Sequence, residues 1–122
     1  MTLRNGIDME RIQRFASILK NEYFCRRIFT ERERAYVEQS GHPAATAAGI
    51  FCAKEAVAKA LGRGLFGLLP REIGLDWTER GDPFVTLTGS AARQYGAWKL
   101  AVSVTHTGDY AAAVCTALLP EE

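Results

Sequence analysis

The chain has 122 residues, of which 48% are hydrophobic and 24% are charged, and its formal net charge is +1. This length and composition predict a single domain over residues 1–122 with enough apolar side chains for a core. The near-neutral charge argues against nucleic acid as a partner, and no apolar run approaches the 18 residues of a membrane helix. Three widely spaced cysteines and no signal-peptide pattern favour a cytoplasmic protein without a disulfide framework.

Residues 3–8 predict a short strand that leads into a helix. Two interpretations of the acids at the junction stay open. If the backbone remains extended, Asp8 and Glu10 point to the same side and can hold a hard cation such as Mg²⁺. Otherwise Asp8 caps the helix and Glu10 lies in its first turn, which is the interpretation that the local pattern favours.

The helix expected over residues 9–22 has an apolar stripe at helical spacing, formed by Ile12, Phe15 and Leu19. Residues 23–29 are expected to form a connection with buried aromatic side chains. Thr30 and Glu33 match a capping box, which predicts a short helix over residues 31–39. Residues 4–34 contain seven arginines and one lysine but only five acids. This third of the chain is therefore either a solvated basic face or a docking patch for an acidic partner.

The central segment, residues 51–64, is expected to be helical because good helix formers dominate it and it contains no proline. Pro43 suits the first turn of this helix, and Gly62 and Gly64 suit its end. Eight alanines between residues 44 and 60 predict close packing against neighbouring elements.

This helix has two distinct sides. Ile50, Val57 and Leu61 share an apolar stripe, whereas Cys52, Glu55 and Lys59 lie on roughly the opposite side. Glu55 and Lys59 are four residues apart with the acid first, so one interpretation is a surface ion pair worth about 0.3–0.5 kcal/mol. The other is half of a phosphate or metal site, because glycine amides can approach an anion and Arg63 adds positive charge.

The remainder of the chain predicts an apolar loop over 65–70, strands over 72–78 and 84–88, a short helix over 90–95, and strands over 98–105 and 110–118. The order of elements predicts an α+β fold in which an antiparallel-rich sheet packs with a long central helix and shorter helices. His106 lies where a strand meets a turn. It is either structural or, if a phosphate site exists elsewhere, a phosphate ligand.

Five short motifs follow one another along the chain: Gly6-Ile7-Asp8 with Arg14 and Phe15, Arg27-Ile28-Phe29-Thr30 with Glu33, Phe51-x-x-Lys54-Glu55-Ala56-x-x-Lys59-Ala60-x-Gly62-x-Gly64, Gly81-x-Pro83, and Val102-Ser103-Val104-Thr105-His106-Thr107. In this order they form a specific signature. The chain thereby resembles, nearly end to end, the small bacterial holo-(acyl-carrier-protein) synthases, the short class of 4′-phosphopantetheinyl transferases.

The resemblance implies Mg²⁺-dependent transfer of 4′-phosphopantetheine from coenzyme A to a serine of apo acyl carrier protein, with release of adenosine 3′,5′-bisphosphate. Asp8 and Glu55 would hold the metal, and Glu10 is a candidate third ligand. Lys59 would contact the bridging phosphates, so the implied catalytic set is Asp8, Glu55 and Lys59. A metal and a lysine are suited to this reaction because negative charge develops on phosphate oxygens.

The resemblance also implies residues that bind the donor: Lys54 at a phosphate, Gly62, Arg63 and Gly64 along the pyrophosphate, and His106 at the 3′-phosphate, next to Thr105. Thr105 stands where a serine is usual and keeps the hydroxyl. Ile50 stands where many members have an arginine, so one nucleotide contact is missing from the pattern.

Further implications concern partners. The resemblance implies a homotrimer with an active site at each subunit boundary, where Asp8, Glu55 and Lys59 of one chain face His106 of its neighbour. An acidic carrier protein would dock on basic residues near the N-terminus, namely Arg11, Arg14, Arg26 and Arg27. The alternative function is a non-catalytic trimer that binds coenzyme A or a nucleotide on the same scaffold.

Overall fold

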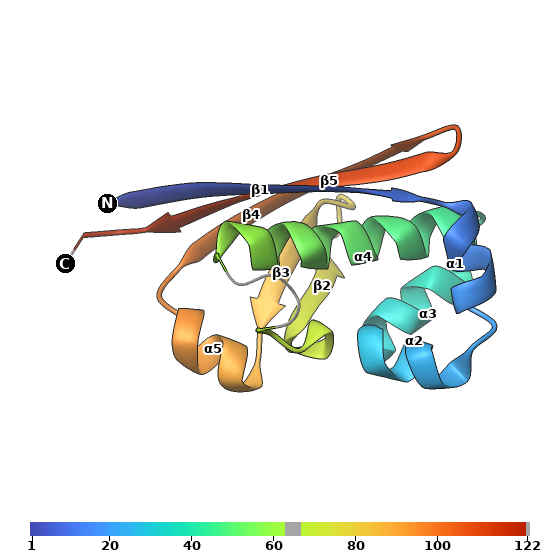
Figure 1. The fold of residues 1–122 in the computed structure, drawn as a ribbon, viewed down its shortest axis with the longest axis horizontal. Helices are drawn as coiled ribbons and strands as arrows, with labels where there is room; N and C mark the ends of the chain where they lie inside the picture. Colours follow the sequence, from blue (N-terminus) through green and yellow to red (C-terminus); the bar gives the residue numbers. More distant parts are fainter. Residues whose placement is uncertain (63–66, 122) are drawn as a thin grey trace.

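The computed structural model describes residues 1–62 and 67–121. In chain order its elements are β1 (Thr2–Arg11), α1 (Gln13–Ile18), α2 (Glu22–Ile28), α3 (Glu31–Gln39), α4 (Pro43–Ala60), the 3-10 turn η1 (Pro70–Glu72), β2 (Ile73–Trp77), β3 (Pro83–Leu87), α5 (Gly89–Tyr95), β4 (Lys99–Thr107) and β5 (Tyr110–Leu119). Figure 1 shows α4 lying along one face of the main sheet, with α1 to α3 gathered near its beginning. None of the described helices is both long and apolar enough to cross a membrane.

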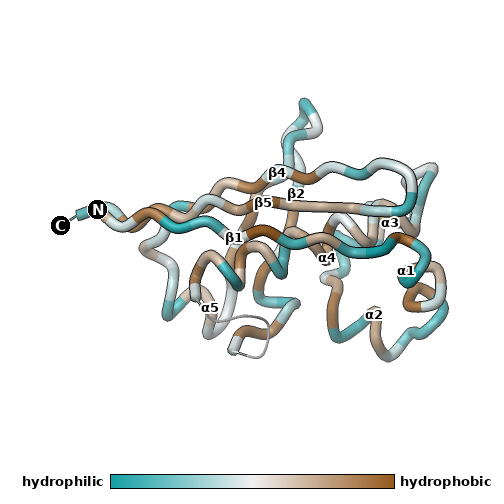
Figure 2. Tube along the Cα trace, turned by 45° about the horizontal axis from the view of Figure 1, so that its top comes forward, coloured by the Kyte–Doolittle hydropathy of each residue, from teal (hydrophilic) through white to brown (hydrophobic). Residues whose placement is uncertain are grey.

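The main sheet has three antiparallel strands in the order β1-β5-β4, and β2 and β3 form a separate antiparallel hairpin. The predicted α+β class with an antiparallel-rich sheet is therefore confirmed. Figure 2 shows the three strands side by side with α4 against them. The register aligns Glu10 on β1 and His106 on β4 with the same residue of β5, Ala111.

Small residues allow α4 to approach the sheet closely. A Cβ at Gly6 would overlap the carbonyl oxygen of Ala56 and lie 2.6 Å from the amide nitrogen of Ala60, so only glycine fits. The side of β5 that faces the helix is built from small buried side chains, namely Ala111, Ala113, Cys115 and Ala117. This confirms the close packing that the alanines of the central segment predict.

Two predictions for the first third of the chain are wrong. β1 continues through Arg11, because each of its residues pairs with β5, and α1 begins only at Gln13. Residues 23–29 are mostly helical, since the side chain of Asn21 accepts a hydrogen bond from the Phe24 amide and caps α2. Tyr23 and Phe24 are exposed on this helix rather than buried.

Elements with strong local signals agree with their predictions. Thr30 and Glu33 form both bonds of the capping box at the start of α3. Pro43 lies in the first turn of α4, and Gly62, with a φ of +82°, follows its end. The predicted loop over 65–70 lies partly outside the described residues, so only its end, leading into η1, can be compared.

Candidate active site

β1 and α4 bring together charged side chains that are about fifty positions apart in the sequence. The ammonium of Lys59 donates to the carbonyl oxygen of Ile7 at 3.0 Å and to Asp8 Oδ1 at 3.3 Å. The predicted Glu55–Lys59 ion pair is absent from the described part of the chain, because Lys59 turns toward β1 instead. Asp8 Oδ2 is buried and has no hydrogen-bond partner among the described residues, so this site has an unsatisfied acceptor.

The backbone at the N-terminal acids is extended, so the interpretation of Asp8 as a helix cap is wrong. Asp8 and Glu10 lie two residues apart on β1 and turn toward α4, with side chains only 10% and 16% exposed. Burial, and then the nearby charge of Asp8, raise the pKa of Glu10. Burial and the same Asp8 charge raise the pKa of Glu55 on α4. Three carboxylates therefore interact electrostatically around Asp8.

These carboxylates differ in how far they are already neutralised. Arg14 donates to Glu10 Oε1 at 2.5 Å, which commits one oxygen of Glu10 to an ion pair. Glu55 is a neighbour of Asp8 but accepts no hydrogen bond from the described residues. Asp8 likewise has its Oδ1 bonded to Lys59, but its Oδ2 is buried without a partner. This oxygen and the carboxylate of Glu55 are therefore the acceptors that gain most from a cation.

Across residues 1–62 and 67–121, no three carboxylate, imidazole or thiol groups are gathered closely enough to hold a metal by themselves. Mg²⁺ does not require such a cage, because it is commonly bound by one or two carboxylates with waters and substrate phosphates in the rest of its shell. The unpartnered oxygen of Asp8 and the mutual repulsion of the acids fit a site of that kind.

Cys52 belongs to the same side of α4 but is not exposed. Its thiol is fully buried beneath the sheet, where it contacts the carbonyl oxygen of Ala111. Burial, followed by the charges of Asp8 and Glu10, raises the pKa of this thiol to about 12. Cys52 is therefore a core residue, although Lys59 on the same side of α4 is half exposed.

The contacts of Lys54 differ from the phosphate contact that the resemblance implies. Its ammonium is fully buried, donates to the carbonyl oxygens of Pro70 and Ile73 at 2.8 Å each, and forms an ion pair with Glu33 Oε1 at 2.8 Å. Burial lowers the pKa of Lys54, and the Glu33 charge opposes this shift. Because the ammonium is fully buried and surrounded by these three acceptors, this geometry argues against Lys54 as a phosphate ligand.

Glu33, which caps α3, completes this buried cluster. Its Oε1 accepts from the amide of Thr30 at 2.8 Å, and its Oε2 accepts from the amide of Leu75 at 2.6 Å. The pair thereby ties α3, α4 and β2 together. Sequence reasoning detected the cap of Glu33 but missed its partner, since nothing local indicates a lysine twenty-one residues away.

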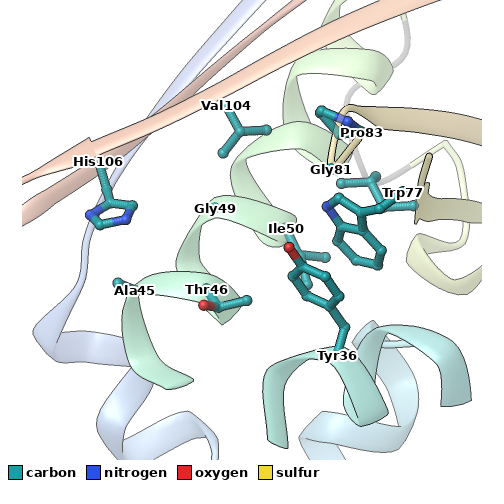
Figure 3. Close-up of a pocket in the computed structure, with 11 residues that line it drawn as sticks. Tyr36, Ala45, Thr46, Gly49, Ile50, Trp77, Gly81, Pro83, Val104 and His106 are labelled. Atoms are coloured by element: carbon teal, nitrogen blue, oxygen red, sulfur yellow. The ribbon is translucent and has the colours of Figure 1, made fainter. Parts of the chain in front are cut away.

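His106 lies on the other flank of α4, at the edge of a cavity of about 230 Å³. Figure 3 shows its imidazole reaching from β4 at one end of the cavity, with the rings of Tyr36 and Trp77 together at the other. These two rings are stacked, with centroids 3.6 Å apart and planes 2° from parallel. The sequence prediction missed both of them, because they come from α3 and β2.

The site residues thus form two groups in one chain. Asp8, Glu55 and Lys59 lie on the β1 side of α4, and His106 on the β4 side, two strand spacings (about 10 Å) from β1. Thr105 alternates with His106 along β4, so it points to the opposite face of the sheet and does not line the cavity. Gly62 lies at the end of α4, whereas Arg63 and Gly64 lie outside the described residues.

The four predicted docking arginines differ in their surroundings. Arg11 ends β1, rather than lying on a helix, and stacks over the Tyr110 ring at 5.1 Å. On α2, Arg26 pairs with Glu22 at 3.1 Å, and Arg27 donates to the hydroxyl of Tyr23 at 2.8 Å.

A shallow groove of about 410 Å³ runs between α2 and η1. Exposed Phe24 and Leu69 contribute apolar surface to it, and three arginines, Arg26, Arg27 and Arg71, contribute charge. Arg71 was not predicted, because it follows a segment that was expected to be an apolar loop.

Known proteins resemble this chain over most of its length. A family model described as the 4′-phosphopantetheinyl transferase superfamily matches residues 4–115. The holo-[acyl-carrier-protein] synthase of Caldanaerobacter subterraneus subsp. tengcongensis is 38% identical over 117 residues, which cover 93% of this chain and 92% of that protein. The enzyme of the same name from Syntrophotalea carbinolica is 40% identical over 112 residues, covering 87% and 88% of the two chains.

Solved structures with similar names superpose on nearly the whole chain. An ACPS–CoA complex, ascribed to Chronobacterium ammoniagenes, superposes with a TM-score of 0.84 at 26% identity, over 99% of this chain and 100% of that one. The acyl carrier protein synthase of Mycobacterium tuberculosis superposes with a TM-score of 0.77 at 34% identity, over 96% and 97%.

Proposed function

The chain belongs to the 4′-phosphopantetheinyl transferase superfamily, and we propose that it is a holo-(acyl-carrier-protein) synthase. It transfers 4′-phosphopantetheine from coenzyme A to a serine of apo acyl carrier protein and releases adenosine 3′,5′-bisphosphate. The reaction depends on Mg²⁺ and takes place in the cytoplasm. The observation that carries this proposal is the buried, unpartnered oxygen of Asp8 beside Glu55 and Lys59.

Asp8 and Glu55 are the proposed metal ligands. A bound Mg²⁺ would neutralise charge on the diphosphate of coenzyme A and relieve the repulsion between the two acids. Glu10 lies beside them but is held by Arg14, so it is proposed to adjust the charge of the site rather than to bind the metal directly.

Lys59 is the proposed phosphate contact. Its side chain is half exposed, and its present partners are one carboxylate oxygen and one backbone carbonyl. One N–H of the ammonium therefore remains available to a phosphate oxygen of the donor. A protonated lysine in this position stabilises the charge that develops as the serine oxygen attacks.

We further propose that the active site is completed across a homotrimer. Asp8 and His106 lie on opposite flanks of α4. A donor that contacts an Asp8 site and a His106 can therefore do so more easily where two subunits meet. The outer face of the main sheet supports self-association, because it exposes large apolar side chains: Leu3 is 60% exposed, Ile7 67%, Met9 64% and Val114 39%.

Apo acyl carrier protein is proposed to dock along the groove between α2 and η1 and toward Arg14. Phe24 and Leu69 offer apolar anchors there, surrounded by Arg26, Arg27 and Arg71. An arrangement of exposed apolar side chains with a basic rim suits an acidic helix, which gains contact area from the anchors and faster association from the charge.

The proposal is tested by incubating apo acyl carrier protein with this chain, coenzyme A and Mg²⁺ and measuring intact mass. The carrier is expected to gain about 340 Da, the mass of one phosphopantetheine group. The Glu55→Gln variant should lose transfer without any fall in its melting temperature, and Glu79→Gln, an exposed acid in a turn, is the matched control. Normal transfer by Glu55→Gln would remove this residue from the mechanism.

The alternative, a non-catalytic trimer that binds coenzyme A or a nucleotide, is favoured by the absence of a guanidinium at Ile50. It predicts that coenzyme A binds, as measured by calorimetry, and that no carrier protein gains mass.

A further inference from the structure

The ion pair between Glu10 and Arg14 joins the end of β1 to α1, at the edge of the candidate metal site. Arg14 donates to Glu10 Oε1 at 2.5 Å, and the Glu10 side chain is only 16% exposed. The guanidinium of Arg14 also lies over the rings of Phe15 and Phe51, 5.6 Å and 5.7 Å from their centroids. Because Phe15 is fully buried and packs against Phe51, these rings give the guanidinium a fixed support. Arg14 is thereby held beside Glu10 by both its charge and its packing.

This pair contributes to the charge that surrounds Asp8 and Glu55. Burial, followed by the charge of Asp8, raises the pKa of Glu55, and the charge of Glu10 adds to this shift. Lys59 and Arg14 act in the opposite direction on the same carboxylate. These five side chains therefore interact electrostatically, with three negative charges opposed by two positive ones. A single negative charge remains to attract a cation, and Arg14 is one of the two groups that keep it so low.

A low negative charge suits a cation that is bound together with an anionic substrate. Mg²⁺ usually keeps several waters and is held by one or two carboxylates and by substrate phosphates. With Arg14 on Glu10, the attraction of the protein alone for a cation stays modest. Without the guanidinium, Glu10 would add a full negative charge near Asp8, whose buried Oδ2 has no hydrogen-bond partner among the described residues. Three carboxylates would attract the cation strongly even without a phosphate.

We propose, on the basis of the function proposed above, that Arg14 is a positioning residue of the metal site, which acts through Glu10 to keep the protein's own affinity for a divalent cation low. The cation is then bound firmly only together with the diphosphate of the donor. Removal of the guanidinium converts the site into one with three free acids, which binds the cation in the absence of donor.

The test measures the dissociation constant of Mn²⁺ for the full chain without donor, by electron paramagnetic resonance of the free ion. Mn²⁺ is a suitable probe because it takes the same oxygen ligands as Mg²⁺. Arg14→Met, which removes the charge from an unbranched side chain, is expected to lower this constant about tenfold. Arg93→Met is the matched control: it removes an exposed arginine from α5, at the other end of the molecule (Figure 1), and should change the constant less than about twofold.

Further variants separate the charge of Arg14 from its packing. Glu10→Gln leaves the guanidinium without its acid and should raise the dissociation constant about tenfold. The double variant Glu10→Gln/Arg14→Met has the net charge of the unaltered chain and should return to within about threefold of its constant. Arg14→Lys, which keeps the cation, should also stay within about threefold. Coenzyme A should tighten Mn²⁺ binding by a larger factor in the unaltered chain than in Arg14→Met.

The outcomes separate this inference from the proposed function. An unchanged constant in Arg14→Met overturns the inference, and so does tight binding that persists in the double variant, because affinity would then not depend on the charge of Glu10. If the unaltered chain transfers phosphopantetheine while either of these results is found, the inference fails and the transferase function stands. If no variant binds Mn²⁺ and no carrier protein gains mass, the proposed function itself fails.

Discussion

The buried pair of Lys54 and Glu33 leads to a sharp prediction about stability. Lys54→Met keeps the volume of the side chain but removes its charge, which leaves the buried Glu33 without its partner cation. Loss of one partner from a buried ion pair costs about 3–5 kcal/mol. The carbonyl oxygens of Pro70 and Ile73 also lose their donor, which adds about 1 kcal/mol for each unsatisfied group. The expected loss is therefore about 5–7 kcal/mol, which lies in the lower part of the range of stability of a whole domain.

The assay is urea unfolding followed by tryptophan fluorescence, with Lys20→Met as the control at an exposed position. The decisive comparison is the double variant Lys54→Met/Glu33→Gln. Because most of the penalty comes from the uncompensated carboxylate, the double variant should be more stable than Lys54→Met alone. A loss below about 1 kcal/mol in Lys54→Met, or a double variant as unstable as the sum of the two single changes, would refute this account.

Three other predictions concern the metal site, the packing of β1 on α4 and the groove between α2 and η1. Burial and the charge of Asp8 raise the pKa of Glu55, so ionisation of Glu55 opposes folding. Without metal, the free energy of unfolding should therefore fall as the pH rises through and above the ordinary pKa range of a glutamate. Mg²⁺ should thus raise the melting temperature more at pH 8 than at pH 5, and Asp8→Asn should abolish this difference; equal shifts would contradict a shared cation. Gly6→Ala should cost about 3 kcal/mol in chemical unfolding, because its Cβ would meet the α4 backbone, while Gly41→Ala, in open space, should be nearly neutral. Arg27→Glu should raise KM for the carrier protein about tenfold in steady-state assays and leave KM for coenzyme A unchanged; a constant carrier KM would exclude the groove.

The predictions that held depend on contacts within a few residues. The capping box of Thr30 and Glu33, the first-turn proline of α4 and the strands of the C-terminal half all have signals that lie inside the element itself. The errors arose where a distant partner overrode the local pattern. Residues 9–11 fit a helix start, yet they remain extended because β5 offers a complete set of backbone partners about a hundred residues away.

The types of the main elements, the α+β class and the family could be predicted from the chain alone, because periodicity, caps and motif order depend on the spacing of residues along it. Which acid each lysine contacts could not: Lys54 pairs with Glu33 in the core, and Lys59 pairs with Asp8 rather than with its helical neighbour Glu55. Helical spacing limits which side chains can meet along α4, but the contacts that form depend on burial and on the approach of β1, α3 and β2.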